Sequence, residues 1–244
     1  MQLPNKFSKE ITIAPSLCDY SGLLGVYDTF RTFMDLANQH ASILGVGQKM
    51  LMDKKLFWLT VKTRIRFYSR PKMDEIVTAQ TWPVKPLSRK TDRCYRLLDQ
   101  DKILAEGRTE WAILDTSTMT LSSTTAIFPE QLVFADDSLS YSDFPRIAAC
   151  DDTYTLKGSY TVNSSDIDMG MHMNNACYVR ALLGLFTVQE LQDMDIKEIT
   201  LLYKASAHEG DVLDLYIKKN QNILEGGFYF KDSKPAILFQ IVEA

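Results

Sequence analysis

The sequence predicts an α+β fold made of two tandem modules, each an antiparallel sheet wrapped around a long helix. The same order of strand, turn, long helix and further strands occurs twice along the 244 residues. A short motif is repeated as well, because Asp-Lys-Ile-Leu-Ala-Glu-Gly at 101–107 parallels Asn-Gln-Asn-Ile-Leu-Glu-Gly at 220–226. We interpret this as a tandem duplication in which each module seals sheet surface that the other would expose.

The first module is expected over residues 1–120. Apolar residues in segment 26–44 recur at three- and four-residue steps, which is the pattern of a helix that buries one broad face. Elsewhere, β-branched and aromatic residues alternate with polar ones, which is typical of half-buried strands. Strands are expected at 7–13, 57–68, 76–83, 90–99 and 103–114.

The second module is expected over residues 153–244. Its helix is predicted at 174–192, after a polar turn at 165–170. Residues 121–152 are rich in Ser, Thr, Asp and Pro and lack sustained periodicity, so they are interpreted as a linker between the modules. Strands of the second module are expected at 154–162, 197–205, 212–219, 223–229 and 236–242.

The composition is that of an ordinary globular protein, with 45% hydrophobic and 24% charged residues. No segment approaches the ~20 apolar residues that a bilayer span needs, and the first ten residues lack the apolar centre of a secretory signal. The four cysteines form no CxxC pair, and three scattered histidines supply no metal-binding pattern. We therefore expect a cytoplasmic protein with no metal, cofactor, membrane span or nucleic-acid partner.

One stretch is basic although the net charge is −4, because residues 54–108 hold 14 Lys/Arg against 6 Asp/Glu. Lys62, Arg64 and Arg66 alternate with apolar residues, so a strand would put these cations on one face. The positive character continues at Lys85, Arg89, Lys90 and Arg93. Two interpretations stay open, namely a solvated sheet face and a docking surface for an acidic partner.

Segment 164–175 joins a polar turn to the start of the second helix and contains His172. A helix start presents unpaired backbone N–H groups whose partial positive charge stabilises an oxyanion. A histidine of ordinary pKa accepts a proton near neutral pH. This combination suits acyl transfer. His40 and His208 are interpreted as ordinary polar positions, and Cys177 as a buried apolar one.

The run Asp-Ile-Asp-Met-Gly-Met-His-Met-Asn-Asn at 166–175, followed by Tyr178, resembles a family signature. It is the Asp-x-Asp-x-Asn-x-His-x-Asn-Asn-x-x-Tyr signature of plant and bacterial acyl-acyl-carrier-protein thioesterases. The first half is similar to the same family at Asp19, Gly22 and Trp58, and in segments 81–83, 93–99 and 111–115. Two positions depart from it. Gly170 replaces an asparagine, and Ser206 and Ala207 stand where plant members have Glu and Cys, which excludes a cysteine nucleophile there.

The resemblance implies a double hot-dog fold with a catalytic C-terminal module and an acyl-binding N-terminal one. It also matches Asp168 and His172 to catalytic positions, although a turn-stabilising role for Asp168 stays open. We expect the pair to activate water for attack on a thioester carbonyl, while backbone N–H groups near Met173 and Asn174 hold the oxyanion. With no amide at Gly170, the rate is lower or its role shifts to Asn174, Asn175 or Ser206.

The acyl chain needs an enclosed apolar pocket, because each methylene buried there contributes ~0.8 kcal/mol to binding. Candidates on the first helix and the strand beside it are Phe30, Met34, Phe57 and Trp58, together with Leu51 and Leu59. The implied partner is acyl carrier protein, which would dock on Lys62, Arg64 and Arg66. The expected activity is release of free fatty acids from that carrier by a monomer or homodimer. The alternatives are an acyl-coenzyme A thioesterase and a catalytically weak acyl-binding protein.

Overall fold

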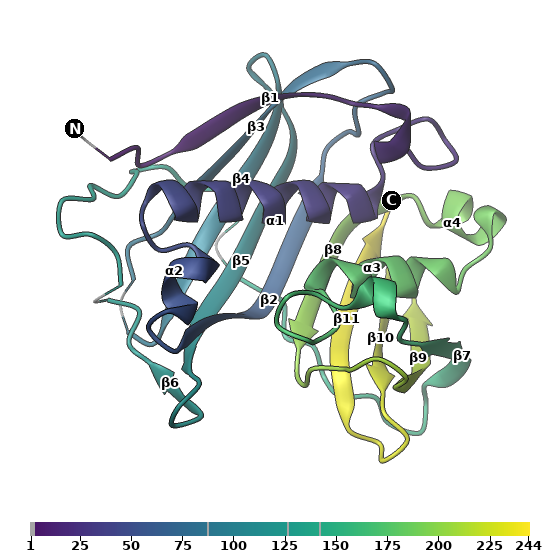
Figure 1. Ribbon diagram of the computed structural model, residues 1–244. Coiled ribbons are helices and arrows are strands. Elements are labelled where there is room, and N and C mark those ends of the chain that lie inside the picture. The colour runs from purple at the N-terminus through teal and green to yellow at the C-terminus, as the bar shows by residue number, and fades with distance from the viewer. Residues whose placement is uncertain (1–2, 87, 126, 142) are drawn as a thin grey trace. The chain divides into compact units, whose positions relative to one another are not determined.

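The computed structural model describes residues 3–86, 88–125, 127–141 and 143–244, and divides the chain into two compact units. The first unit is Met1–Asp143 and the second is Phe144–Ala244. Each is a curved antiparallel sheet with a helix lying across one face (Figure 1). The α+β class expected from the sequence is confirmed.

The sheet of the first unit has the strand order β1-β3-β4-β5-β2, and the short β6 pairs with β5. The helix α1, Val26–Ile43, lies on it and is followed by the short helix α2, Gln48–Met52. Neither α2 nor β6 was expected from the sequence, since both are too short to show a periodicity. The strands are β1 Phe7–Thr12, β2 Leu56–Phe67, β3 Ile76–Pro83, β4 Lys90–Asp99, β5 Lys102–Asp115 and β6 Thr120–Ser122.

The sheet of the second unit has the order β8-β11-β10-β9-β7 and carries the helix α3, Asn175–Gly184 (Figure 1). Val179 and Leu182 of α3 are fully buried against it. The expected strands are present within about two residues of their expected ends. Their bounds are β7 Thr155–Thr161, β8 Ile196–Tyr203, β9 Val212–Asn220, β10 Ile223–Tyr229 and β11 Pro235–Glu243.

Packing requires the glycine of the repeated Glu-Gly pair in both units. A Cβ on Gly107 would lie 2.9 Å from the ring of Phe33, which stacks on Tyr95 at 4.9 Å between ring centroids. A Cβ on Gly226 would lie 2.1 Å from the carbonyl oxygen of Tyr216. Both positions therefore exclude any side chain, because the space is already filled by backbone or by an aromatic ring.

Part of the segment that follows β6 packs against the rest of the first unit. Phe128 and Leu132 form an apolar cluster with Leu44 and Val46 at the end of α1. Farther along, Asp137 pairs with Arg96 at 3.1 Å. This part of the connecting segment is thus attached by both apolar packing and ion pairing.

The single helix expected at 174–192 is wrong, because the structure has α3 and a separate helix α4, Val188–Met194. Gly184 weakens the helix at the break. Thr187 then starts a new helix, since its hydroxyl accepts from Glu190 N at 3.2 Å while Glu190 Oε2 accepts from Thr187 N at 2.7 Å. This reciprocal capping is visible in the sequence as Thr-x-x-Glu.

Replacing Thr187 by alanine is expected to destabilise the second unit by about 1 kcal/mol, because the first turn of α4 loses its side-chain acceptor. Urea unfolding followed by circular dichroism measures the change. Thr187→Ser keeps the hydroxyl and is the matched control. Equal stability of the alanine variant and the unchanged protein would show that the cap contributes nothing.

Candidate active site

His172 lies in a tight turn between β7 and α3. The turn is closed on itself, because Asp168 N donates to His172 O at 2.9 Å and Met171 N donates to Asp168 O at 3.0 Å. Ile167 and Met173 pair as an isolated antiparallel bridge beneath it. Met171 has φ 61°, a left-handed conformation that a non-glycine residue adopts only where its surroundings impose it. The backbone thus fixes Asp168 and His172 on one short loop.

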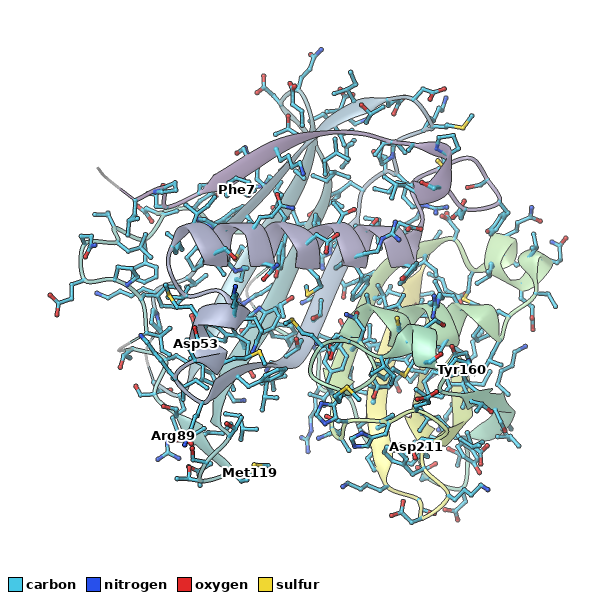
Figure 2. The ribbon with its side chains drawn as sticks, viewed as in Figure 1. Phe7, Asp53, Arg89, Met119, Tyr160 and Asp211 are labelled. Carbon is cyan, nitrogen blue, oxygen red and sulfur yellow. The ribbon has the colours of Figure 1, made fainter. Side chains whose placement is uncertain are left out.

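Asp166 anchors this turn from below with a carboxylate that is only 1% exposed. Its Oδ2 accepts from Tyr160 Oη, a residue labelled in Figure 2, and from Asn163 N, each at 2.8 Å. Its Oδ1 pairs with Arg180 of α3. A buried carboxylate is tolerated only when it is paired and hydrogen-bonded in this way.

A second loop, residues 204–211 after β8, is hydrogen-bonded to the turn. Met173 N donates to Ala207 O at 2.8 Å, and Ala207 N donates to the Tyr178 hydroxyl oxygen at 3.1 Å. Burial raises the pKa of Tyr178 to about 12, so its hydroxyl stays neutral. The two loops are therefore held in register through the backbone of Ala207.

This register brings His208 beside His172, with 4.8 Å between ring centroids. Nδ1 of His208 lies 3.2 Å from Met171 O, and it must carry the hydrogen because a carbonyl oxygen only accepts. His208 N donates to Asp211 Oδ2 at 2.8 Å (Asp211 is labelled in Figure 2). Interpreting His208 as an ordinary turn residue missed this pairing, and no local pattern could have shown it.

The Asp168 side chain is engaged locally. Its Oδ1 accepts from Gly170 N at 2.8 Å, an interaction that stabilises the turn. Within the described part of the chain it makes no hydrogen bond to the imidazole of His172. The two residues share a loop and are half-buried, and the second carboxylate oxygen stays available for another partner.

The expected oxyanion donors at Met173 and Asn174 are wrong. Both N–H groups already donate within the fold, to Ala207 O and to Asp166 O respectively, each at 2.8 Å. Asn174 caps α3, since its Oδ1 accepts from Ala176 N at 2.9 Å, which leaves its side-chain N–H₂ for a ligand. Ser206 and His208 line an open hollow of about 520 Å³ in the same unit, together with Lys231 and Lys234.

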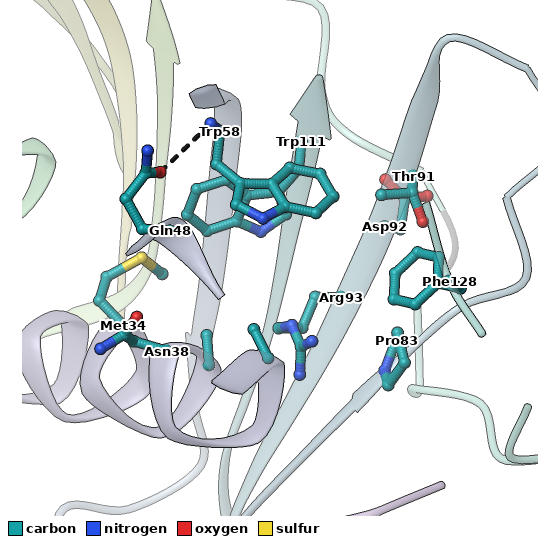
Figure 3. A pocket seen from close by; sticks show the side chains of 12 residues that line it. Met34, Asn38, Gln48, Trp58, Pro83, Thr91, Asp92, Arg93, Trp111 and Phe128 are labelled. Carbon is teal, nitrogen blue, oxygen red and sulfur yellow. Dashed lines mark hydrogen bonds between the residues drawn. The ribbon is translucent and has the colours of Figure 1, made fainter. Parts of the chain in front are cut away.

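A separate cavity of about 110 Å³ lies in the first unit (Figure 3). Met34 on α1 and Trp58 on β2 line it, and both were expected to contact an acyl chain. Of the other four candidates, Phe30 and Leu51 are buried and Phe57 and Leu59 are half-buried. None of the four is among the lining residues. The other apolar lining residues are Ala37, Ala41, Pro83, Trp111 and Phe128, and the polar or charged ones are Asn38, Gln48, Thr91, Asp92 and Arg93.

The surroundings of His40 and Arg93 differ from those expected from the sequence. His40 was interpreted as an ordinary polar position, and it is fully buried, which lowers its pKa to about 4. Its Nε2 donates to Pro4 O at 2.9 Å, so its Nδ1 can accept from Arg93 Nη1 at 3.1 Å. Arg93 is 6% exposed and lines the cavity, so it is not a surface cation. Strand β4 turns it inward, and periodicity alone did not reveal this.

The proposed docking cations lie on β2 as the alternation predicted, with Thr63, Ile65 and Phe67 facing the core. They are also engaged within the first unit. Lys62 pairs with Glu110 at 3.4 Å. Arg64 and Arg66 lie over the ring of Tyr141, at 4.3 and 5.0 Å from its centroid. The face is therefore shared with Tyr141.

Family models match most of the chain. The acyl-ACP thioesterase N-terminal domain matches residues 4–129 and the C-terminal domain matches residues 151–238. The chain belongs to the acyl-ACP thioesterase family. Among curated relatives, oleoyl-acyl carrier protein thioesterase 2 of Arabidopsis thaliana is 25% identical over 70% of this chain, and the Coriandrum sativum enzyme is 24% identical over 65%. The chain spans about half the length of these relatives.

Solved structures of acyl-ACP thioesterases share the fold. A thioesterase from Bacteroides thetaiotaomicron has a TM-score of 0.88 and 21% identity, with 98% of both chains covered. The 12:0-ACP thioesterase from Umbellularia californica has a TM-score of 0.85 and 14% identity, covering 99% of this chain and 98% of that one. These likenesses confirm the double hot-dog architecture.

Two features are absent from the residues that the structure describes. No group of three or more His, Cys, Asp or Glu side chains is placed to hold a metal ion. The described helices also lack the length and hydropathy that a membrane span requires.

Proposed function

We propose that the chain hydrolyses fatty acyl thioesters of acyl carrier protein to free fatty acids, with catalysis in the C-terminal module and the acyl chain held in the N-terminal one. The observation that carries the proposal is the His172 turn, which a buried carboxylate anchors and a second loop holds beside His208. Family membership supports the thioester as the substrate class.

In the proposed reaction, His172 takes a proton from water as the water oxygen attacks the thioester carbonyl. Asp168 orients the water through its free carboxylate oxygen, and the Asn174 amide donates to the reacting oxygen. The tetrahedral intermediate then collapses, the carbon–sulfur bond breaks, and the imidazolium returns its proton to the leaving thiolate. Positioned general-base help of this kind is worth roughly 10²- to 10⁴-fold in rate.

Side-by-side assays test the function and separate its alternatives. The purified protein is given medium- and long-chain acyl carrier protein, the same acyl chains on coenzyme A, and a blank without enzyme. Faster hydrolysis of the carrier-bound chains supports the proposal. Preference for coenzyme A would replace it with an acyl-coenzyme A thioesterase. Acyl binding without any hydrolysis would leave only an acyl-binding protein.

We further propose that the acidic carrier docks on Lys62, Arg64 and Arg66. Changing all three to glutamine is expected to raise KM for carrier-bound substrate about tenfold and to flatten its salt dependence, because long-range attraction is lost. Hydrolysis of a small thioester should stay unchanged.

The matched control removes three exposed cations from another surface of the same unit, Lys49, Lys54 and Lys55. Net charge then changes equally in both variants. An equal rise in KM for the two would mean that total charge, and not this face, attracts the carrier. Unchanged carrier kinetics in the first variant would remove the docking surface.

A further inference from the structure

Arg93 is a buried cation beside a largely apolar cavity, and its hydrogen bonds leave several of its N–H donors without an acceptor. Its Nη1 donates to His40 Nδ1 at 3.1 Å and lies 3.3 Å from Thr81 Oγ1. A guanidinium has five N–H donors, so these contacts leave several of them open. Figure 3 shows Arg93 of β4 together with Met34 and Asn38 of α1 around the cavity.

No negative charge compensates Arg93 among the described residues. The groups that favour its charged form are Tyr95 and Cys94, and burial raises the pKa of each to about 12, which keeps both neutral. His40 is neutral as well. The nearby carboxylate of Asp92 is taken by Arg108, whose Nε donates to it at 3.1 Å. A buried charge without a partner is costly, so such a site favours an oxygen ligand.

A second donor in the cavity is also unpaired. Gln48 Nε2 is buried without a hydrogen-bond partner, while its Oε1 accepts from Trp58 N at 3.3 Å. The unsatisfied groups of Arg93 and Gln48 are both donors. A hydrocarbon chain alone would leave each of them desolvated.

We propose that this cavity takes an acyl chain whose remote end carries an oxygen function, a hydroxyl, carbonyl or carboxylate, which accepts hydrogen bonds from Arg93 and Gln48. The proposal rests on the proposed function, in which the N-terminal module holds the acyl chain of the thioester. The walls formed by Met34, Trp58 and Phe128 would then contact the methylenes.

Matched substrates test the proposal. Acyl carrier protein is loaded with plain, ω-hydroxy and ω-carboxy chains of 8, 10, 12 and 14 carbons, and kcat/KM is compared within each length. We expect at least one oxygenated chain to exceed its plain counterpart by about tenfold or more, since a site built to hydrogen-bond an oxygen discriminates against chains that lack it. Plain chains preferred at every length would overturn the proposal.

Variants identify the donors responsible. Arg93→Met should bring the ratio of oxygenated to plain substrate down to about one, and Gln48→Leu should lower it partly. Because Arg93→Met also removes a partner of His40, Gln48→Leu provides a second test if the first variant folds poorly. Arg31→Met makes the same change on the exposed side of α1 and should keep the ratio. A ratio unchanged in both cavity variants would show that these donors do not recognise the chain.

Binding measured without hydrolysis separates this proposal from the proposed function. Trp58 and Trp111 line the cavity, so their fluorescence reports a free ω-hydroxy acid or its plain counterpart entering it. Tighter binding of the oxygenated acid with no thioester cleaved would sustain the cavity proposal and remove the enzymatic one. Cleavage without any preference in rate or binding would remove the cavity proposal alone.

Discussion

Replacing His172 by alanine is expected to lower kcat for acyl carrier protein thioesters by about 10²- to 10⁴-fold, because water then loses its positioned base. The His172 imidazole makes no hydrogen bond to other described residues, and its ring lies beside that of His208. Its removal should therefore leave the fold intact. Steady-state kinetics give the rate, and thermal unfolding by circular dichroism checks the structure.

Two companion variants sharpen this test. Asp168→Ala should lower kcat as well, and Asp168→Asn should keep the turn hydrogen bond to Gly170 while losing the charge. Near-normal hydrolysis in both His172→Ala and Asp168→Ala would disprove the assignment. His208→Phe retains a ring beside His172 and distinguishes packing from proton transfer. If His208→Phe alone abolished hydrolysis, the base would be His208.

Replacing Asp166 by alanine is expected to destabilise the second unit by about 3 kcal/mol. The variant leaves the Tyr160 hydroxyl and the Asn163 N–H without their acceptor, and hydrogen bonds to a charged group are worth about 1.5–3 kcal/mol each. It also loses the ion pair to Arg180, whose side chain is 43% exposed and contributes less. The loss of activity should exceed the effect of unfolding alone, because this carboxylate anchors the His172 turn.

Tryptophan placement makes the measurement specific. All three tryptophans, Trp58, Trp82 and Trp111, lie in the first unit, so their fluorescence reports its unfolding in urea. Circular dichroism reports both units, and a transition seen without a fluorescence change belongs to the second. Arg180→Met is the control and should cost less than Asp166→Ala. Equal stability of Asp166→Ala and the unchanged chain would contradict the anchoring role.

The elements of the fold could be predicted because their signals are local. Strands β3, β4 and β10 have the bounds that were expected from their content of β-branched and aromatic residues. Helix α1 follows its apolar face from residue 26. The break between α3 and α4 was also encoded locally, in the capping pair Thr187 and Glu190, but the apolar content on both sides of it favoured one continuous helix.

By itself, the sequence determined the duplicated α+β architecture, the family, and the turn that carries Asp168 and His172, since these depend on periodicity and on a contiguous motif. Only the tertiary structure decided what lies across from them. It placed His208 beside His172 and paired the N–H groups of Met173 and Asn174 with carbonyl oxygens of the fold. It also placed Arg93 in the lining of a cavity. The physical reason is that hydrogen-bond partners and burial are set by strand register and loop packing, which join residues that are far apart in the chain.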